Sequence, residues 1–400
     1  MKQTKSLEDG IQLLLSNEEC TVFNSDDSLG MLGELLQLQQ CRKAAVFTGR
    51  NSADSNGSWS KLLDSLRYND CAVVRFKNIP AEPDMQTVED MRTFLVQENP
   101  DCVIALGGGS VMDAAKAAYI IFQSNMQLEE CFGSNCITSR FPEGRFKRII
   151  AVPTTSGTGS ELTQYSNIVN CTKQVKQLIS DPVLVPEAAV LNGDFTSSMP
   201  RSVSLATGCD ALAHLLEGWL NVNMDAGNPV INEAALTGVK LLLENLETVL
   251  QEPHNRQARK AVQIAAALGG MTIRHKSTGL PHLLSFSWFG RIEHGIAVAR
   301  LLPAAWRYYI QRQEVAARTL EIGKVFGGST PEAVIANYEN FLDKLQVPCL
   351  RDFPELDAGL LRATSRSAGA NRMKLELAPR PVELAASGKI LEDILNEAFQ

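Results

Sequence analysis

The sequence predicts two domains: an α/β domain over residues 1–195 built on a parallel sheet, and an all-helical domain over residues 196–400. Three observations support this prediction. A chain of 400 residues is longer than one hydrophobic core usually serves. In the first half, short β-rich runs alternate with stretches of helical periodicity, which is typical of a parallel sheet covered by helices. After about Pro200 the strand patterns nearly vanish and helical periods dominate.

The α/β half is predicted from alternating segments. The expected strands are Lys43–Thr48, Cys71–Phe76, Asp101–Leu106, Arg148–Val152 and Ala188–Leu191, the last of which would close the sheet. The expected helices between them are Trp59–Leu66, Asp84–Gln97 and Val111–Phe122. Two further runs flank Thr172-Lys173 and predict a β-hairpin, Tyr165–Asn170 and Val175–Ile179.

The second half is predicted to be helical because apolar residues recur there with a period near 3.6. The expected helices are Ser204–Leu220, Asn228–Leu250, Arg256–Met271, Glu314–Phe326, Pro331–Leu345 and Glu355–Gly369.

Composition excludes several classes of function. The chain is 44% hydrophobic and 21% charged, and its net charge of −7 argues against a nucleic-acid-binding surface. The first residues show no apolar signal segment, and no run of about eighteen apolar residues predicts a membrane span. The nine cysteines form no Cys-x-x-Cys pair, so we expect reduced core cysteines in a cytoplasmic protein.

A glycine-rich turn, Gly107-Gly108-Gly109-Ser110, follows a predicted strand and opens a predicted helix that includes Asp113. Backbone N–H groups at a helix N-terminus bind anions, and glycines let a phosphate come close. The run matches neither the usual dinucleotide fingerprint nor the Walker pattern. A phosphate site and a simple tight turn therefore both remain open on this motif alone.

A second unusual segment, Thr154-Thr155-Ser156-Gly157-Thr158-Gly159-Ser160, follows another predicted strand directly. Its five hydroxyl side chains and two glycines can surround a polar ligand with side-chain and backbone donors. The alternative is a flexible Ser/Gly loop, although such loops seldom start directly from a buried strand.

Asp210 and His214 lie four residues apart on a predicted helix, so both can face the same ion. His282 and His294 follow at or near glycines, and the chain has only five histidines. One carboxylate and three imidazoles make a complete ligand set for a divalent metal. An Asp-x-x-x-His pair can equally be a helix cap, a salt bridge or a satisfied buried histidine.

These motifs, in this order and together with Asp181-Pro182, resemble the iron-containing (group III) alcohol dehydrogenases over about residues 40–310. The resemblance implies a Rossmann-like dinucleotide-binding domain and a helical domain, as in dehydroquinate synthase-like enzymes, with Fe²⁺ or Zn²⁺ in the cleft between them. It assigns the metal to Asp210, His214, His282 and His294, and the cofactor pyrophosphate to Gly107–Ser110. The other cofactor-binding residues expected from the matching motifs are Asp113, Thr154, Thr155, Thr158, Ser160 and Lys176.

The chain departs from the family pattern near the last two ligands. Many members carry Pro-His-Gly where this chain has Glu293-His294-Gly295, and the interval from His282 to His294 is two residues shorter than usual. His282 is therefore the ligand that the spacing supports least. Many members also have a proton-transferring histidine where this chain has Phe286, so we expect water or a cofactor ribose hydroxyl to supply the proton.

The cofactor prediction is NADPH, with NADH as the alternative. Members that use NADH often carry an acidic residue just after the first strand, whereas this chain reads Thr48-Gly49-Arg50-Asn51-Ser52. Arg50, with the hydroxyls of Thr48 and Ser52, could hold a 2′-phosphate that a carboxylate would repel. Alternatively, Arg50 is a solvated loop charge.

The substrate prediction follows one branch of the family, the phosphonoacetaldehyde reductases, which the run from Lys276 to Phe286 resembles. A phosphonate dianion needs nearby cations and hydroxyl donors, and Lys276, Ser285 and Arg291 are the candidates. The alternative is that both cations are surface charges and that the substrate is a neutral aldehyde, alcohol or diol. A homodimer is expected because relatives are commonly dimeric.

The resulting hypothesis is a metal-dependent, NAD(P)H-linked reductase of a small aldehyde, with phosphonoacetaldehyde converted to 2-hydroxyethylphosphonate as the specific reaction. Two alternatives remain. One is a dehydroquinate-synthase-like lyase, which would return its cofactor unchanged. The other is a binding protein that keeps the fold without catalysis, which Phe286 and Glu293 would favour.

Overall fold

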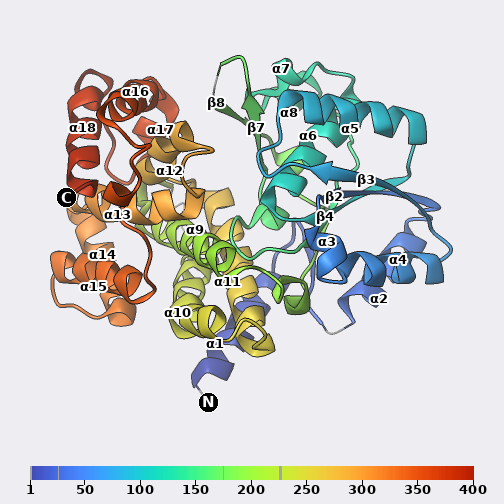
Figure 1. Ribbon diagram of the computed structural model, residues 1–400, viewed down its shortest axis with the longest axis horizontal. Coiled ribbons are helices and arrows are strands. Elements are labelled where there is room, and N and C mark those ends of the chain that lie inside the picture. Colours follow the sequence, from blue (N-terminus) through green and yellow to red (C-terminus); the bar gives the residue numbers. More distant parts are fainter. Residues whose placement is uncertain (1, 26, 174, 225–227) are drawn as a thin grey trace.

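The computed structural model describes residues 2–25, 27–173, 175–224 and 228–400. It confirms the predicted fold class, a parallel-sheet domain followed by a helical domain, which lie side by side as two lobes (Figure 1). Helix α1 (Lys2–Leu15) is an exception to the sequence division, because it packs against α10 and α11 of the helical lobe. Its buried Leu14 belongs to the helical core, so the first helix lies apart from the sheet domain predicted for residues 1–195.

The main sheet is six-stranded and parallel, in the order β1-β9-β6-β4-β2-β3. Its strands are β1 (Thr21–Phe23), β2 (Lys43–Gly49), β3 (Ala72–Ile79), β4 (Cys102–Gly107), β6 (Ile150–Pro153) and β9 (Ala188–Val190). The prediction that Ala188–Leu191 closes the sheet is wrong, because β9 lies inside it and β1 forms the edge. Three residues are too few for a periodic signal, which is why β1 escaped the sequence analysis.

Both faces of this sheet are buried. Ala45 and Phe47 of β2 belong to one core cluster, while Ala44 and Val46 belong to the other, as the two-residue period of a strand requires. Helices therefore cover the sheet on each side, which is the arrangement expected for parallel strands.

The topology places a crevice at the carboxyl ends of the sheet's strands. The chain leaves β2 for β3 on one side and then returns to β4 on the other side of β2. The connections that follow β2 and β4 thus diverge, and ligands of open α/β sheets bind at this switch point, outside the carboxyl ends of the strands. Gly49 and Gly107 are the last residues of these two strands.

The predicted hairpin is confirmed as an antiparallel pair, β7 (Tyr165–Asn170) and β8 (Val175–Ser180), with β5 (Gly133–Ser134) beside β8. The helices of this domain are α2 (Ser28–Leu38), α3 (Ser52–Ser55), α4 (Ser58–Tyr68), α5 (Met85–Glu98), α6 (Gly109–Ser124), α7 (Leu128–Cys131) and α8 (Cys136–Arg140).

The helical domain is built around α9 (Arg201–Leu220), most of whose side chains are buried. Helices α10, α11 and α13 pack around it. The remaining helices are α10 (Pro229–Gln251), α11 (Arg256–Lys276), α12 (Leu280–Ser285), α13 (His294–Tyr309), α14 (Gln313–Phe326), α15 (Pro331–Lys344), α16 (Ala358–Gly369), α17 (Arg372–Leu377) and α18 (Ser387–Ala398). Helix α13 was not predicted because it contains Pro303, a residue that normally interrupts a helical pattern.

Short 3₁₀ turns complete the chain: η1 (Ser160–Leu162), η2 (Pro182–Leu184), η3 (Gly193–Thr196), η4 (Val222–Met224), η5 (Phe286–Trp288), η6 (Leu350–Asp352) and η7 (Leu384–Ala386). Among the described helices, none has both the length and the apolarity needed to cross a lipid bilayer.

Candidate active site

Helix α9 carries two of the predicted metal ligands into the core of the helical domain. Asp210 and His214 lie one helical turn apart and are 4% and 5% exposed. His282 comes from the short helix α12, and His294 is the first residue of α13. Gly295 permits this meeting, because a Cβ there would lie 1.8 Å from the carbonyl oxygen of Ala206 on α9.

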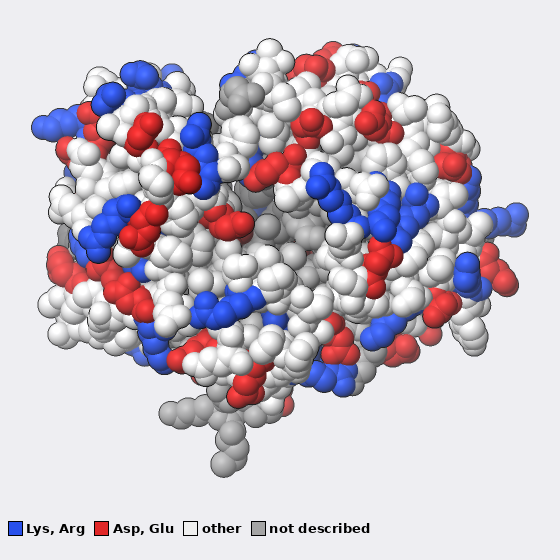
Figure 2. All heavy atoms as spheres, viewed as in Figure 1, with Lys and Arg blue, Asp and Glu red and all other residues white. Residues whose placement is uncertain are grey.

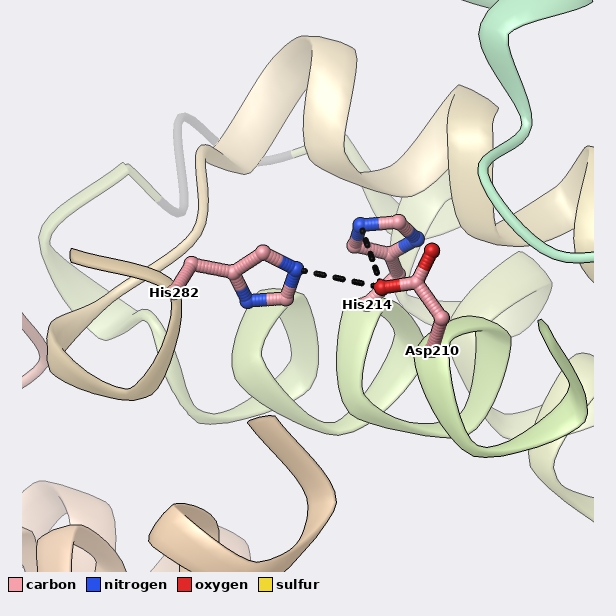
Figure 3. A group of neighbouring side chains, drawn as sticks. All are labelled: Asp210, His214 and His282. Carbon is pink, nitrogen blue, oxygen red and sulfur yellow. Dashed lines mark ion pairs between the residues drawn. The ribbon is translucent and has the colours of Figure 1, made fainter. Parts of the chain in front are cut away.

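The four side chains converge on one carboxylate oxygen. The Nε2 atoms of His214, His282 and His294 lie 3.6, 3.5 and 3.7 Å from Asp210 Oδ1. Figure 3 shows the rings of His214 and His282 turned toward this oxygen from separate segments. The His294 side chain is 33% exposed, whereas the side chain of His282 is 4% exposed, so His294 borders the solvent-accessible side of the site.

This arrangement fits a divalent metal ion. Asp210 Oδ1 and His282 Nε2 are buried and have no hydrogen-bond partner, although leaving such atoms unpaired costs about 1–3 kcal/mol each. The ligand atoms of Asp210, His214 and His282 all lie within 4.8 Å of one another. Imidazole nitrogens and a carboxylate oxygen suit Fe²⁺ or Zn²⁺.

Glu217 orients His282, and the sequence analysis missed it. His282 Nδ1 donates to Glu217 Oε1, and the N–H of Gly279 donates to Glu217 Oε2 at 2.5 Å. The bond keeps a proton on Nδ1, so Nε2, the atom that faces Asp210, is the one left to bind a metal. Glu217 follows His214 by three residues on α9, and this spacing was the signal that could have revealed it.

Ser285 acts on His294. Its hydroxyl donates to the carbonyl of His282 at 2.8 Å and lies 3.1 Å from His294 Nδ1, from which it can accept. Ser285, predicted to bind a substrate anion, thus lies where its hydroxyl can orient the His294 ring.

The predicted anion pocket is not assembled among the described residues. Lys276 is buried and its ammonium donates to Asn232 Oδ1 on α10 at 2.6 Å. Arg291 lies exposed in the segment that precedes α13. Sequence proximity to His282 and His294 suggested this pocket, but side-chain direction, which sequence does not give, sends the groups apart. Phe286 stacks on His294 with ring centroids 6.3 Å apart, so this position offers no proton donor.

The mutual charges set the protonation of the site. Burial alone would raise the pKa of Asp210, but the three imidazoles hold it well below its usual range. Burial alone would lower the pKa of His282, but the carboxylates of Glu217 and Asp210 outweigh this effect and raise the pKa to about 9. Burial lowers the pKa of His294 to about 3, with positive His282 and Lys176 adding to the effect. Lys176 lies on β8 of the α/β domain.

The glycine turn and the hydroxyl-rich loop meet at the carboxyl edge of the sheet. A Cβ on Gly108 would lie 3.1 Å from Thr155, and one on Gly109 would lie 2.7 Å from Thr158. Thr154 Oγ1 is buried without a hydrogen-bond partner. Two predicted motifs are therefore brought together beside the switch point.

Two of the predicted cofactor residues are engaged inside the protein. Asp113 accepts from the hydroxyl of Ser160 at 2.7 Å, and it also accepts from the backbone N–H of Asn167 at 2.9 Å. Lys116, missed in the sequence analysis, is buried and donates to the Ser160 carbonyl at 2.7 Å. These bonds join α6 to the hydroxyl-rich loop, and Ser110 likewise donates to the carbonyl of Ala81.

The glycines of the hydroxyl-rich loop allow close contact between the two domains. A Cβ on Gly157 would lie 2.6 Å from Thr207 of α9, and one on Gly159 would lie 2.5 Å from Gly270 of α11. The loop backbone therefore touches the helices that surround the metal site.

The predicted adenosine end holds a cluster of charges. Thr48 is buried and accepts from Arg75 Nε at 3.0 Å. Arg75 also makes a bidentate pair with Asp54 at 2.8 and 2.9 Å, and Lys77 lies 3.0 Å from the same carboxylate. Arg50 and Ser52 are exposed on the adjoining loop. Arg75 and Lys77 belong to the next strand, β3, which is why reasoning along one loop overlooked them.

Figure 2 shows the surface hollowed between the two lobes on the viewed face. The metal ligands belong to the helical lobe and the glycine turn to the α/β lobe. Lys176 reaches this region from β8 and pairs with Glu82 at 2.8 Å.

Comparisons with known proteins decide the family. Residues 20–193 match the model of the iron-containing alcohol dehydrogenases, and residues 204–354 match the C-terminal model of the same family. The 1,3-propanediol dehydrogenase of Klebsiella pneumoniae is 30% identical over 72% of this chain and 73% of its own. The chain belongs to the iron-containing alcohol dehydrogenase family.

Further relatives agree with this assignment. The NADPH-dependent butanol dehydrogenase of Clostridium saccharobutylicum is 27% identical over 79% of this chain and 82% of its own. The iron-containing alcohol dehydrogenase of Thermotoga maritima has the same fold, with a TM-score of 0.81 and 26% identity over 95% of this chain and 98% of its own. Family membership makes the protein an oxidoreductase of alcohols or aldehydes, for which NAD(P) and a divalent metal are typical.

Proposed function

We propose that the protein is a metal-dependent, NADPH-linked reductase that converts a small aldehyde to its alcohol. The convergence of three imidazole Nε2 atoms on Asp210 Oδ1 carries this proposal, because two of the buried polar atoms have no partner without an ion. When bound, the metal supplies a Lewis acid that polarises the carbonyl toward hydride from the nicotinamide.

The residues of the chain divide the remaining work. Asp210, His214, His282 and His294 would hold the ion, while Glu217 and Ser285 fix the rings of His282 and His294. The N-terminus of α6 would bind the pyrophosphate, because its glycines leave the backbone N–H groups accessible to an anion. Thr154 and Thr155 would line the nicotinamide side. The ring of Phe286 lies nearly parallel to that of His294, with centroids 6.3 Å apart.

The preference for NADPH rests on the charges beside the adenosine end. Gly49 ends β2 without a carboxylate, and Arg50, Arg75 and Lys77 outnumber Asp54 there. An Arg near this position accommodates a 2′-phosphate. The name of the Clostridium relative, an NADPH-dependent dehydrogenase, supports the same choice.

For the substrate, a small neutral aldehyde is the first candidate, because the relatives that match are named for 1,3-propanediol and butanol. Phosphonoacetaldehyde is the second candidate. The basis for it is the resemblance of the run from Lys276 to Phe286 to the phosphonoacetaldehyde reductases, with Lys176 of β8 as the candidate cation. Lys176 could instead contact the cofactor ribose, in which case no cation would be left for a phosphonate.

The test is NADPH oxidation by protein reconstituted separately with Fe²⁺ and with Zn²⁺, and propionaldehyde, lactaldehyde and phosphonoacetaldehyde are compared as substrates. Turnover of the neutral aldehydes supports the first candidate, and a strong preference for the phosphonate supports the second. Silence with every aldehyde and both metals would refute the reductase and favour a lyase or a binding protein. NADH, assayed in parallel, should give a lower kcat/KM than NADPH.

A further inference from the structure

We propose that Lys374 of α17 is a positioning residue for the metal site and acts on His282 through the turn 277–279 and Glu217. This inference rests on the proposed metal-dependent function. Lys374 lies beyond residues 20–193 and 204–354, the two regions that match the family models.

Lys374 is a buried cation that hydrogen-bonds only neutral oxygens among its described contacts. The residue is 6% exposed, and its ammonium donates to Ser277 Oγ, Thr278 Oγ1 and the Thr278 carbonyl at 2.8, 2.9 and 3.1 Å. Burial lowers the pKa of Lys374 to about 8, and the negative charge of Glu217 opposes this shift. The nearby carboxylate that stabilises the buried ammonium is thus the one that orients His282.

The bonds of Lys374 hold an unusual turn. Ser277 has φ 58° and ψ 155°, a region that a residue with a side chain adopts at a cost of about 1–3 kcal/mol. Lys374 binds the side chain of Ser277 and both oxygens of Thr278, so it holds both the strained residue and the residue that follows it. The backbone of the turn is also held by the N–H of Ser277, which donates to the carbonyl of Ile273 at 2.9 Å.

The turn delivers one N–H group to the metal site. Gly279 follows Thr278 directly, and its N–H donates to Glu217 Oε2 at 2.5 Å. A Cβ on Gly279 would lie 2.7 Å from the hydroxyl of Tyr309, so the fit leaves no room for a displaced backbone. Because Glu217 Oε1 accepts from His282 Nδ1, a shift of the turn would release one oxygen of Glu217 and loosen the ring of His282.

Lys374 is better suited to this role than to binding a substrate anion. Its N–H groups already donate to three oxygens of the turn, and it lies behind Glu217, on the Nδ1 side of His282. The metal-facing atom of that ring is Nε2. An effect of Lys374 should therefore appear in metal affinity first.

The experiment compares wild-type protein with Lys374→Met, Lys374→Arg and the matched control Arg372→Met. Arg372 lies on the same helix, but its side chain is 77% exposed and pairs only with Glu376 among its described contacts. Zn²⁺ and Co²⁺ affinities are measured by competition with a chelator, together with the absorption spectrum of bound Co²⁺ and the melting temperature of the metal-free protein. Lys374→Met should weaken affinity by up to about tenfold, less than the 10- to 100-fold that loss of a direct partner of a metal ligand causes, because Lys374 acts through the turn and Glu217. Lys374→Arg should recover most of the loss, and Arg372→Met should bind as wild type.

A second variant, Thr278→Val, keeps the proposal testable if Lys374→Met fails to fold. It removes one acceptor of the ammonium and keeps the lysine, so it should weaken metal binding in the same direction by a smaller factor. Wild-type affinity and an unchanged Co²⁺ spectrum in both variants, with only the melting temperature lowered, would overturn this proposal alone. Wild-type protein that binds neither ion would overturn the proposed function and this inference with it.

Discussion

The two sides of the cleft offer different means of binding a ligand. The helical side uses buried charged and imidazole side chains, with Asp210 and Glu217 at 4% and 0% exposure. The α/β side uses glycines and threonines, where close packing such as Gly109 on Thr158 brings backbone toward the ligand. An ion needs a few fixed atoms, whereas a dinucleotide can share its binding among many weak donors. Single substitutions should therefore have large effects on the helical side and graded effects on the α/β side.

The largest effect is expected for His214→Ala. The change removes an imidazole whose Nε2 lies 3.6 Å from Asp210 Oδ1. Metal content should fall to background, and activity should fall by more than the roughly 100-fold that loss of an outer partner costs. Metal analysis and aldehyde reduction measure both. Thr155→Ala, across the cleft, is the matched control and should retain its metal; full activity in His214→Ala would break the comparison.

Glu217→Gln should have the next largest effect. Glutamine loses the charge, and its amide has one acceptor oxygen for two donors, His282 Nδ1 and the N–H of Gly279, so metal affinity should fall by about 10- to 100-fold. Chelator competition measures the affinity. Because kcat/KM for NADPH would be affected only through metal content, saturating metal should restore most of the activity. An unchanged metal affinity would mean that the Glu217 carboxylate serves only as the hydrogen-bond acceptor of the Gly279 N–H.

The raised pKa of His282 predicts how metal affinity depends on pH. The Glu217 carboxylate, against burial, raises this pKa to about 9, so the ion must displace a proton at neutral pH. Affinity should fall by about tenfold per pH unit below pH 9, and calorimetry in two buffers at pH 7.5 should detect about one proton released per ion. The metal-free protein should lose stability as pH rises from about 6.5 through 9, because the folded state keeps a proton that the unfolded state has released. A flat affinity profile would contradict the assignment.

The smallest effect is expected at the adenosine end. Asp54→Asn frees Arg75 and Lys77, which the carboxylate now binds at 2.8 to 3.0 Å. The ratio of kcat/KM for NADPH to that for NADH should rise by about fivefold at most, the scale of a surface ion pair. Lys77→Met should move the ratio in the opposite direction. A change in metal content in either variant would break the separation between the two sides.

Sequence predicted the architecture because its signals are periodic and local. The alternation of strands and helices and the hairpin over Tyr165–Asn170 depend on residues close in the chain, whereas β1 is too short and α13 contains Pro303. The Asp210–His214 pair follows from helix spacing, and Glu217 could have been added by the same reasoning. The roles of Ser285 and Lys276 depend on which neighbour a side chain meets, and sequence order does not contain that information.

Gly159 of the hydroxyl-rich loop and Gly270 of α11 bring the backbones of the two sides of the cleft close together. A methyl group on Gly270 would stand 2.2 Å from the carbonyl oxygen of Gly159, so it would act as a wedge at the seam between the lobes. Because this contact lies close to α9, a small separation of the lobes there would become a larger separation at the mouth of the cleft. The two glycines thus determine the width of the cleft across which a hydride would have to pass.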